Sequence, residues 1–483
     1  MKKSIWLENN RNFESLRSDI STDILIIGGG MSGTNTLYFL KDSNYNITLV
    51  NNTNYNTSCN STAKITYLQQ DIYEKIKKTV GLDKAKRYYK SQKDAINLIT
   101  SIIKKENIDC DLTMAPSYLF TESKEKFDST RKILKSLNIN YQATSSIPIP
   151  INNIHSLKVD DTYLFNPYRY IYELKKKLIK QKHINIFDNT LIRKIEKKNN
   201  LYLAYTKDNI IKCKTIILAC HYPFYVEKTF PFRTYLERSI LSAIPCKSAS
   251  PFSIINLDSN VLSLRSYKNQ IIFLSNSHNI NHVQNINKLL SNHLKTIFTY
   301  YNVKTNYTWI NHDIMTNDHI PLAGKIKHEN IYLLTGYNTW GMTNSTICAK
   351  LISDLVLKNK SLYTSLFSLY RNTNIKKLGT DIIYSFSSGA TLLSNKINKE
   401  KTYYPESVYI KKEHNKTYGI YIDNKGIKHI VSNLCPHMKC NLFFNCYDKT
   451  WDCPCHGSRF DIDGNVIKGP STFSIKIKEK KDL

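Results

Sequence analysis

Two cysteines and two histidines near the C-terminal end of the chain have the types and spacing of metal ligands. Cys435 and His437 form a C-x-H box, and after fifteen intervening residues Cys453 and His456 form a C-x-x-H box. Two thiolates suit one ferric ion of a two-iron cluster, and two neutral imidazoles suit the other. The same side chains could hold a structural zinc ion, because Cys₂His₂ is also a zinc ligand set. The spacing is not the usual one of a zinc finger, so it favours a Rieske-type [2Fe–2S] cluster.

A glycine-rich turn near the start of the chain predicts a second cofactor site. The turn has the pattern G-x-G-x-x-G and contains Gly28, Gly30, Met31, Ser32 and Gly33. It follows a buried strand at 23–27 and precedes a helix at 34–41, with a second strand at 47–50. In such a unit the glycines allow a tight turn and a close approach to a pyrophosphate, which the helix N-terminus faces. The unit therefore predicts dinucleotide binding.

Asn51 departs from the usual dinucleotide pattern. The end of the second strand usually carries a carboxylate that binds the ribose hydroxyls. The Asn51 amide can still bind a hydroxyl, but without the charge assistance that a carboxylate gives. We therefore expect weaker binding of the dinucleotide, or further contacts to it from other parts of the chain. The sequence has no second G-x-G-x-x-G and no C-x-x-x-x-C pair near the first. Both absences argue against a pyridine-nucleotide disulfide reductase.

The elements around these two sites predict an α/β fold followed by a small all-β domain. Helices are expected over 71–106, within 163–184, at 284–300 and at about 343–357, and strands at 186–188, 201–205, 215–219, within 252–276 and at 331–335. From about Tyr403 the chain changes to short strands and turns. The polar segment before it is predicted to be a connector, so we place a domain boundary near residue 400.

The composition is that of a globular protein. Its 483 residues are 41% hydrophobic, and that length corresponds to roughly three domains. The net charge is +29, but Lys, Asn, Ile and Tyr are over-represented along the whole chain, as in an AT-rich genome, so we expect no nucleic-acid partner. The sequence lacks a run of 18 apolar residues, and its first segment has no apolar core, so we expect a cytoplasmic protein without an integral membrane segment.

With these motifs the chain resembles the bacterial FAD-dependent oxidoreductases of the D-amino-acid-oxidase/glycine-oxidase superfamily that carry a C-terminal Rieske domain. Besides the Cys–His boxes, the segments that carry this resemblance are GGGMSG (28–33), STAKIT (61–66), HYPFY (221–225), DHIPLAG (318–324) and TGYNTWGMTNST (335–346). The resemblance covers nearly the whole chain. It implies a mixed α/β and α+β fold, in which a Rossmann-type FAD-binding domain is interleaved with a β-rich substrate domain and followed by an all-β Rieske domain. The implied boundaries are 20–85, 150–225 and 315–365 for the FAD-binding domain, 86–149 and 226–314 for the substrate domain, 366–402 for the connector and 403–483 for the Rieske domain.

The resemblance also implies where the cofactors lie. FAD would place its pyrophosphate on the glycine turn, and the segment 336–343 would bring a helix N-terminus to the flavin ring, where its dipole stabilises the anionic reduced flavin. Cys440 and Cys455 would form a disulfide that joins the two cluster loops, and Lys439 replaces a glycine common in Rieske proteins. The further residues expected at the FAD, besides the turn and Asn51, are Ser61, Thr62, Lys64, Ile192, Gly336, Gly341, Met342 and Thr343.

The leading functional hypothesis is an oxidoreductase with two cofactors. A small-molecule substrate, an amine or amino acid by resemblance, would reduce FAD, and the [2Fe–2S] cluster would exchange electrons singly with an external redox carrier. The candidate catalytic residues are His221, Tyr222, Arg238, His319 and Trp340. Two alternatives stay open: an oxygen-reducing oxidase with an accessory Rieske domain, and a non-enzymatic electron-transfer or redox-sensing protein.

A Rieske oxygenase is not expected. Those enzymes place the Rieske domain before an iron domain that has two histidines and a carboxylate as ligands. A close pair outside the boxes, His278 and His282, lies in a polar Asn-rich stretch that we predict to be a solvated loop.

Overall fold

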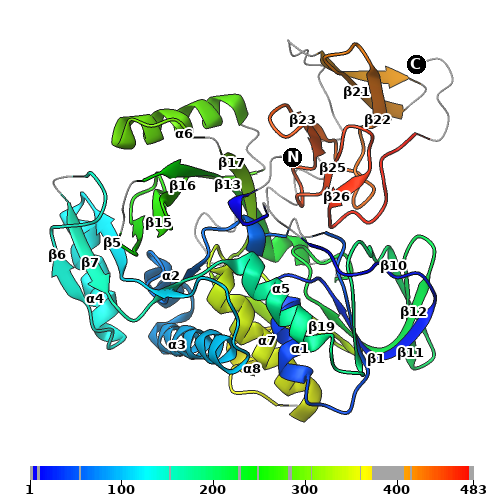
Figure 1. The fold of residues 1–483 in the computed structure, drawn as a ribbon, viewed down its shortest axis with the longest axis horizontal. Coiled ribbons are helices and arrows are strands. Elements are labelled where there is room, and N and C mark those ends of the chain that lie inside the picture. Colours follow the sequence, from blue (N-terminus) through cyan, green and yellow to red (C-terminus); the bar gives the residue numbers. More distant parts are fainter. Residues whose placement is uncertain are drawn as a thin grey trace.

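The computed structural model describes most of the chain (Figure 1). The described residues are 4–7, 11–53, 56–151, 154–226, 230–246, 250–280, 286–305, 307–358, 360–372, 407–413 and 416–477. Within these ranges no helix is both long enough and apolar enough to cross a membrane. Most of the expected connector, 366–402, and the boundary near residue 400 lie outside the described residues.

The first sheet carries the glycine turn. Its strands are β1 (Ile20–Ile27), β2 (Ile47–Val50), β9 (Ile184–Phe187), β10 (Lys194–Lys198), β11 (Leu201–Tyr205), β12 (Ile210–Leu218), β18 (Leu322–Lys325) and β19 (Ile331–Thr335). The centre is parallel, in the order β12-β1-β2-β9, and β19 pairs with β12. All four residues of β2 are buried. Strands in parallel sheets are covered on both faces, which explains the uninterrupted apolar runs in this part of the sequence.

Helices pack beside this sheet. They are α1 (Met31–Leu40), α2 (Ile72–Val80), α3 (Leu82–Lys105), α5 (Pro167–Leu178), α7 (Gly341–Lys358) and the short α8 (Thr364–Phe367). Helix α1 packs against α5 and α7, and α3 packs against α7 (Figure 1). The helix expected over 71–106 is divided at Gly81, which has a φ of 97°. A glycine in this conformation ends α2 and begins α3.

The second sheet has eight strands in the order β17-β13-β16-β15-β14-β5-β7-β6. They are β17 (Tyr307–Thr316), β13 (Thr234–Pro245), β16 (Gln270–Asn279), β15 (Ser263–Tyr267), β14 (Ser253–Asn256), β5 (Ser117–Thr121), β7 (His155–Val159) and β6 (Gln142–Thr144). Helices α4 (Lys124–Ser136) and α6 (Ile286–Tyr301) pack on it. A third, small sheet consists of β3 (Lys64–Ile65), β8 (Tyr163–Leu164) and β4 (Thr113–Met114), which pair with one another and not with the two larger sheets.

Two elements differ from the expected domain boundaries. Strand β7 pairs with β5, so it belongs to the second sheet, although residues 150–225 were expected in the FAD-binding domain. Most of α3 falls in the segment 86–149 expected for the substrate domain, yet the helix packs against α7. A local pattern of apolar residues predicts the element but not the layer that covers its apolar face.

The C-terminal domain consists of two small antiparallel sheets. The strands are β20 (Val408–Glu413), β21 (Lys416–Ile422) and β22 (Lys428–Ser432) in one sheet, and β23 (Phe443–Asn445), β24 (Thr450–Asp452), β25 (Arg459–Phe460) and β26 (Val466–Lys468) in the other. Trp451 is fully buried between them, and a Cβ on Gly419 would lie 2.5 Å from its ring. The sheet of β23–β26 lies on the side of the domain that faces β13 and β17 of the second sheet, while β21 and β22 lie farther away (Figure 1).

Candidate active site and metal centre

The two Cys–His boxes lie on neighbouring loops of the C-terminal domain. Cys435 and His437 follow β22, while Cys453 and His456 lie between β24 and β25. The thiols of Cys435 and Cys453 are hydrogen-bonded to each other. The ring centroids of His437 and His456 are 5.1 Å apart. The fold therefore brings all four expected ligands together.

Three of these side chains, His437, His456 and Cys435, have protonation behaviour that suits ligands of a [2Fe–2S] cluster. Within the described part of the chain, both ring nitrogens of His456 are buried without a hydrogen-bond partner. Burial lowers the pKa of His456 to about 3 and that of His437 to about 4, so both imidazoles are neutral donors. A hydrogen bond from the Cys453 thiol lowers the pKa of Cys435 to about 7, which favours a thiolate there. The set of donors fits a Rieske cluster.

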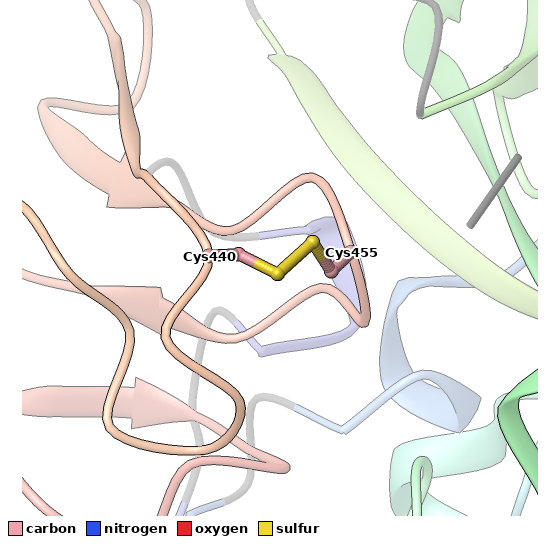
Figure 2. Close-up of a disulfide and its surroundings, with 2 residues drawn as sticks. All are labelled: Cys440 and Cys455. Atoms are coloured by element: carbon pink, nitrogen blue, oxygen red, sulfur yellow. A yellow bond between two sulfur atoms is a disulfide. The ribbon is translucent and has the colours of Figure 1, made fainter. Parts of the chain in front are cut away.

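Cys440 and Cys455 form a disulfide between the two ligand loops (Figure 2). The sulfur of Cys453 lies within 4.8 Å of both disulfide sulfurs, but of these three cysteines only Cys453 keeps a thiol that can bind a metal. Lys439 precedes Cys440 and has a φ of 61°. A left-handed backbone favours glycine, so the lysine occupies a position that is strained for its side chain.

The glycine turn forms part of the wall of a cleft that residues of both large sheets and of the C-terminal domain line. A Cβ on Gly33 would lie 1.8 Å from the carbonyl oxygen of Gly28, so α1 can pack this closely only with glycine at that position. Gly28 has a φ of 115°, and its Cβ would lie 2.6 Å from the carbonyl oxygen of Ala219. The first residues of α1 line the cleft. A helix N-terminus beside side-chain-free backbone suits the pyrophosphate of a dinucleotide.

Most of the residues expected at the FAD line this cleft. They are Gly28, Gly30, Met31, Ser32, Asn51, Ser61, Ile192, Gly336, Gly341 and Met342, together with the catalytic candidates His221 and Tyr222. A Cβ on Gly341 would meet no atom within 4 Å, so the space in front of the α7 N-terminus is open. The residues present therefore fit an extended FAD with helix N-termini at two places along it.

Asn51 uses both ends of its amide inside the protein. Its Oδ1 accepts a hydrogen bond from the N–H of Gly29 (3.3 Å), and its Nδ2 donates to Oδ1 of Asp188 (3.0 Å). Asp188 follows β9, is buried, and lies 3.7 Å from the Nζ of Lys175. Asn51 thus links the glycine turn to a buried carboxylate on the next strand, a contact that the sequence pattern did not predict.

A second cavity adjoins the cleft. Ser61, Asp313, Gly341 and Met342 line both spaces, while the expected FAD residues Thr62 and Lys64 and the catalytic candidates His319 and Trp340 line only the second cavity. Lys64 is buried, and its Nζ donates to the carbonyl oxygen of Ile254 (2.8 Å) and to Oγ of Ser263 (2.6 Å). Burial lowers the pKa of Lys64 well below its usual value. Thr62 and Lys64 therefore belong to the wall beyond the cleft.

Three further residues, Thr343, Arg238 and His278, do not lie where the sequence led us to expect them. Thr343 accepts a hydrogen bond from Gln69 Nε2 (3.2 Å) and lines neither space. Arg238 also lines neither space, since its Nη2 lies 3.1 Å from Oδ2 of Asp452 and its Nε donates to Nε2 of His312 (3.0 Å). His278 lies in β16 and not in a solvated loop, because pairing with β13 continues through it. His282 lies outside the described residues.

Two charged residues of the cleft were missed by reasoning from the sequence. Asp313 in β17 lines both spaces, and burial raises its pKa to about 6. Lys468 comes from β26 of the C-terminal domain, and its Nζ lies 3.4 Å from Oγ1 of Thr57. Neither residue belongs to a motif, and only the packing of distant segments brings them to the cleft.

Tyr222 connects the cleft with the metal centre. It lines the cleft, and its ring centroid lies 5.0 Å from that of His456 and 6.3 Å from that of His437. The two sites thus share a side chain as a common wall.

Comparison with known proteins identifies both parts. The family model of FAD-dependent oxidoreductases matches residues 23–355. The chain belongs to this FAD-dependent oxidoreductase family. The family model of the Rieske [2Fe–2S] domain matches residues 395–478. FAD and a Rieske-type [2Fe–2S] cluster are therefore the cofactors of this oxidoreductase.

This oxidoreductase is similar to a curated protein over nearly its whole length and to solved structures over about three quarters of it. The Rieske 2Fe-2S iron–sulfur protein YhfW of Bacillus subtilis is 29% identical over 96% of this chain and 95% of its own length. Among solved structures, L-amino acid deaminase from Proteus vulgaris has a TM-score of 0.60 at 15% identity, covering 75% of this chain and 97% of that one. Glycine oxidase from Geobacillus kaustophilus has a TM-score of 0.60 at 12% identity, covering 73% and 99%. At these identities the two structures establish a shared fold.

Proposed function

We propose that this oxidoreductase oxidises the carbon–nitrogen bond of a small amine or amino acid and passes the electrons singly to an external redox carrier. The observation that carries the proposal is the position of Tyr222, which lines the FAD cleft and packs against His456. When bound, FAD supplies two-electron oxidation of the substrate and the Rieske cluster supplies one-electron transfer. A shared wall between the two sites supports electron exchange within one chain.

The second cavity is the proposed substrate site, because it adjoins the cleft at the α7 N-terminus. Lys75 and Lys126, which line it, pair with Asp71 (3.1 Å) and Asp258 (3.1 Å) respectively. Lys64 is held by protein acceptors, as described above. Asp71 and Asp258 line the cavity themselves, as do two further acids, Glu237 and Asp313. Of these four acids Asp313 is the one that also reaches the cleft.

Asp313 is the proposed anchor of the substrate nitrogen. A carboxylate at the boundary of both spaces would hold an ammonium group beside the reacting end of the cofactor and orient the adjacent C–H bond. Asn311 Nδ2 donates to Oδ2 of Asp313 (3.0 Å) and so fixes the carboxylate. Trp340 and Met342 present apolar surface to the same cavity, which would displace water from the reacting carbon. The names of the structural neighbours, an amino acid deaminase and a glycine oxidase, support a nitrogen-bearing substrate.

An anaerobic screen of amines and amino acids tests this proposal. Bleaching of the flavin absorption by a member of the panel, followed by the Rieske EPR signal in the same sample, is the expected result. Rapid oxygen consumption with hydrogen peroxide formation, and a cluster that stays oxidised, would instead favour an oxidase with an accessory Rieske domain. Tight FAD retention without bleaching by any amine or amino acid would contradict the proposed substrate class. The cytoplasmic location stays a prediction, which cell fractionation can check.

A further inference from the structure

The C-terminal domain supplies part of the wall of the FAD cleft. Six consecutive residues, 467–472, line the cleft opposite segments of the first domain. Thr472 Oγ1 donates to the carbonyl oxygen of Arg193 (2.8 Å), the residue after Ile192. In its own domain, the N–H of Ser471 donates to Oγ of Ser458 (2.9 Å), two residues after the cluster ligand His456. The segment is thus fixed to both domains.

Lys468 brings a positive charge to this wall. Among the described residues that line the cleft, it is the only lysine or arginine, and Asp313 is the only acid. Its Nζ lies 3.4 Å from Oγ1 of Thr57, which in turn is 3.0 Å from Nδ1 of His221. Burial and, to a smaller extent, the charge of Arg459 lower the pKa of Lys468 to about 7, although Asp313 and Asp452 oppose the change. A desolvated cation of this kind gains most from an anionic group beside it.

The position of Lys468 indicates which part of the cofactor it serves. Thr57, which Lys468 contacts, donates from Oγ1 to the carbonyl oxygen of His312 (3.3 Å), the residue before Asp313. Asp313 lies where the cleft meets the substrate cavity, and the α7 N-terminus at Gly341 is at that same junction. The reacting ring of a bound FAD must lie where substrate can reach it. The pyrophosphate, in contrast, is expected to bind at the glycine turn and the α1 N-terminus, so it does not need Lys468.

We propose that FAD is held by both domains and that Lys468 is a positioning residue for the flavin ring, whose negative charge on reduction it stabilises. The Rieske domain would then do more than accept electrons, because it would also tune the flavin that delivers them. This inference rests on the FAD assignment and not on the identity of the substrate.

The test uses the full-length protein with Lys468→Met, Lys468→Gln and Lys468→Arg, and with Lys476→Met as a matched control. Lys476 is an exposed lysine of the same domain outside the cleft. Sulfite is the probe, since it forms a bond to the flavin N5 and leaves an anionic ring without needing substrate. The second readout is the dissociation constant of FAD from the FAD-stripped protein, and circular dichroism and the Rieske EPR signal verify that each variant is folded.

We expect Lys468→Met and Lys468→Gln to weaken sulfite binding by about tenfold or more, the size of a lost charge-assisted hydrogen bond, and to weaken FAD binding as well. Lys468→Arg should retain most of both affinities, and Lys476→Met should match the unaltered protein. Unchanged sulfite and FAD affinities in folded Lys468→Met and Lys468→Gln would overturn the proposal. So would an equal loss in Lys476→Met, because that result would reflect net charge alone.

Discussion

The guanidinium of Arg238 in β13 lies 3.1 Å from the carboxylate of Asp452 in β24, so a buried ion pair crosses the boundary between the two domains. The side chains are 6% and 2% exposed. Asp452 also accepts a hydrogen bond from Nε of Arg459 (2.9 Å), and Tyr447 donates to the carbonyl oxygen of Thr308 (2.9 Å) nearby. These contacts hold the Rieske domain against the second sheet, with Tyr222 between the two cofactor sites.

Removing either member of this pair should loosen the domain interface. Asp452→Asn leaves Arg238 buried without its carboxylate, although Arg459 keeps its second partner Asp448 (2.6 Å). Arg238→Met leaves Asp452 paired with Arg459, so we expect Asp452→Asn to be the more harmful change. The loss in the free energy of unfolding should be about 3–5 kcal/mol for Asp452→Asn and smaller for Arg238→Met. Chemical denaturation measures the loss, and limited proteolysis reports whether the domains separate.

The matched control for this pair is an exposed one. Lys214 lies 2.9 Å from Asp23 with 68% of its side chain accessible, so Lys214→Ala should cost less than about 1 kcal/mol. Equal and small losses in Asp452→Asn and Lys214→Ala would show that the interface does not depend on the ion pair.

Asn51→Asp, which restores the usual carboxylate of a dinucleotide site, should weaken FAD binding in this protein. The new carboxylate would face Oδ1 of Asp188, which the Asn51 amide contacts at 3.0 Å. Two carboxylates in contact cannot both ionise without cost, so FAD affinity should fall by about tenfold at pH 8. It should recover as the pH is lowered, because one shared proton removes the repulsion.

Fluorescence of FAD titrated with the stripped protein measures this change. Asn52→Asp is the control, since Asn52 also lines the cleft and undergoes the same chemical change one residue away. Tighter FAD binding in Asn51→Asp than in the unaltered protein would contradict the account of Asn51 as a link between the turn and Asp188.

Lys439→Gly should stabilise the C-terminal domain and lower the reduction potential of the cluster. The φ of 61° at Lys439 is costly for a residue with a Cβ, and glycine relieves about 1 kcal/mol of this strain. Removal of a cation next to Cys440 also disfavours the added electron. Lys439→Gln separates the two effects, because it lowers the potential but keeps the strain. Thermal unfolding measures the stability, and redox titration measures the reduction potential. If Lys439→Gln raised the Tm as much as Lys439→Gly does, backbone strain at residue 439 would not be the cause.

The rate of flavin reduction by an amine should increase as the pH rises through about 6. Burial raises the pKa of Asp313 to about 6, so the carboxylate that binds an ammonium group is present above that pH and lost below it. Asp313→Asn should abolish this dependence and slow the reduction by at least about tenfold. Glu237→Gln, a change to a cavity acid that does not line the cleft, should keep the pH dependence. Stopped-flow spectroscopy from pH 5 to 8 compares them, and a pH dependence that persists in Asp313→Asn would assign it to another group.

The cofactors were predictable from the sequence, while much of their environment was not. The cluster ligands and the glycine turn are local patterns, in which a few residues at fixed spacing determine both chemistry and geometry. Lys468 and Thr57 meet across 411 positions of sequence, so no local signal announces their contact. Arg238 was one of the catalytic candidates, yet its carboxylate partner Asp452 is on the other domain and lies 214 positions away in the sequence.

Element types were similarly easier to predict than their places in the fold. The strand at 331–335 was expected with the bounds of β19 because five consecutive buried residues form it. The apolar pattern of β7 gave no indication of its sheet, since both large sheets offer an apolar face. The sequence showed that Asn51 replaces the usual carboxylate of a dinucleotide site. It did not show that Asn51 contacts the carboxylate of Asp188, because Asp188 follows another strand.

Photoreduction tests the central claim, electron exchange between FAD and the cluster in one chain, without knowledge of the substrate. The anaerobic protein is illuminated with EDTA while flavin absorption is recorded, and samples are frozen at intervals for EPR. We expect the Rieske signal to grow in step with flavin bleaching, and to be absent from FAD-stripped protein under the same light. A fully bleached flavin beside a cluster that stays EPR-silent until dithionite is added would contradict the account.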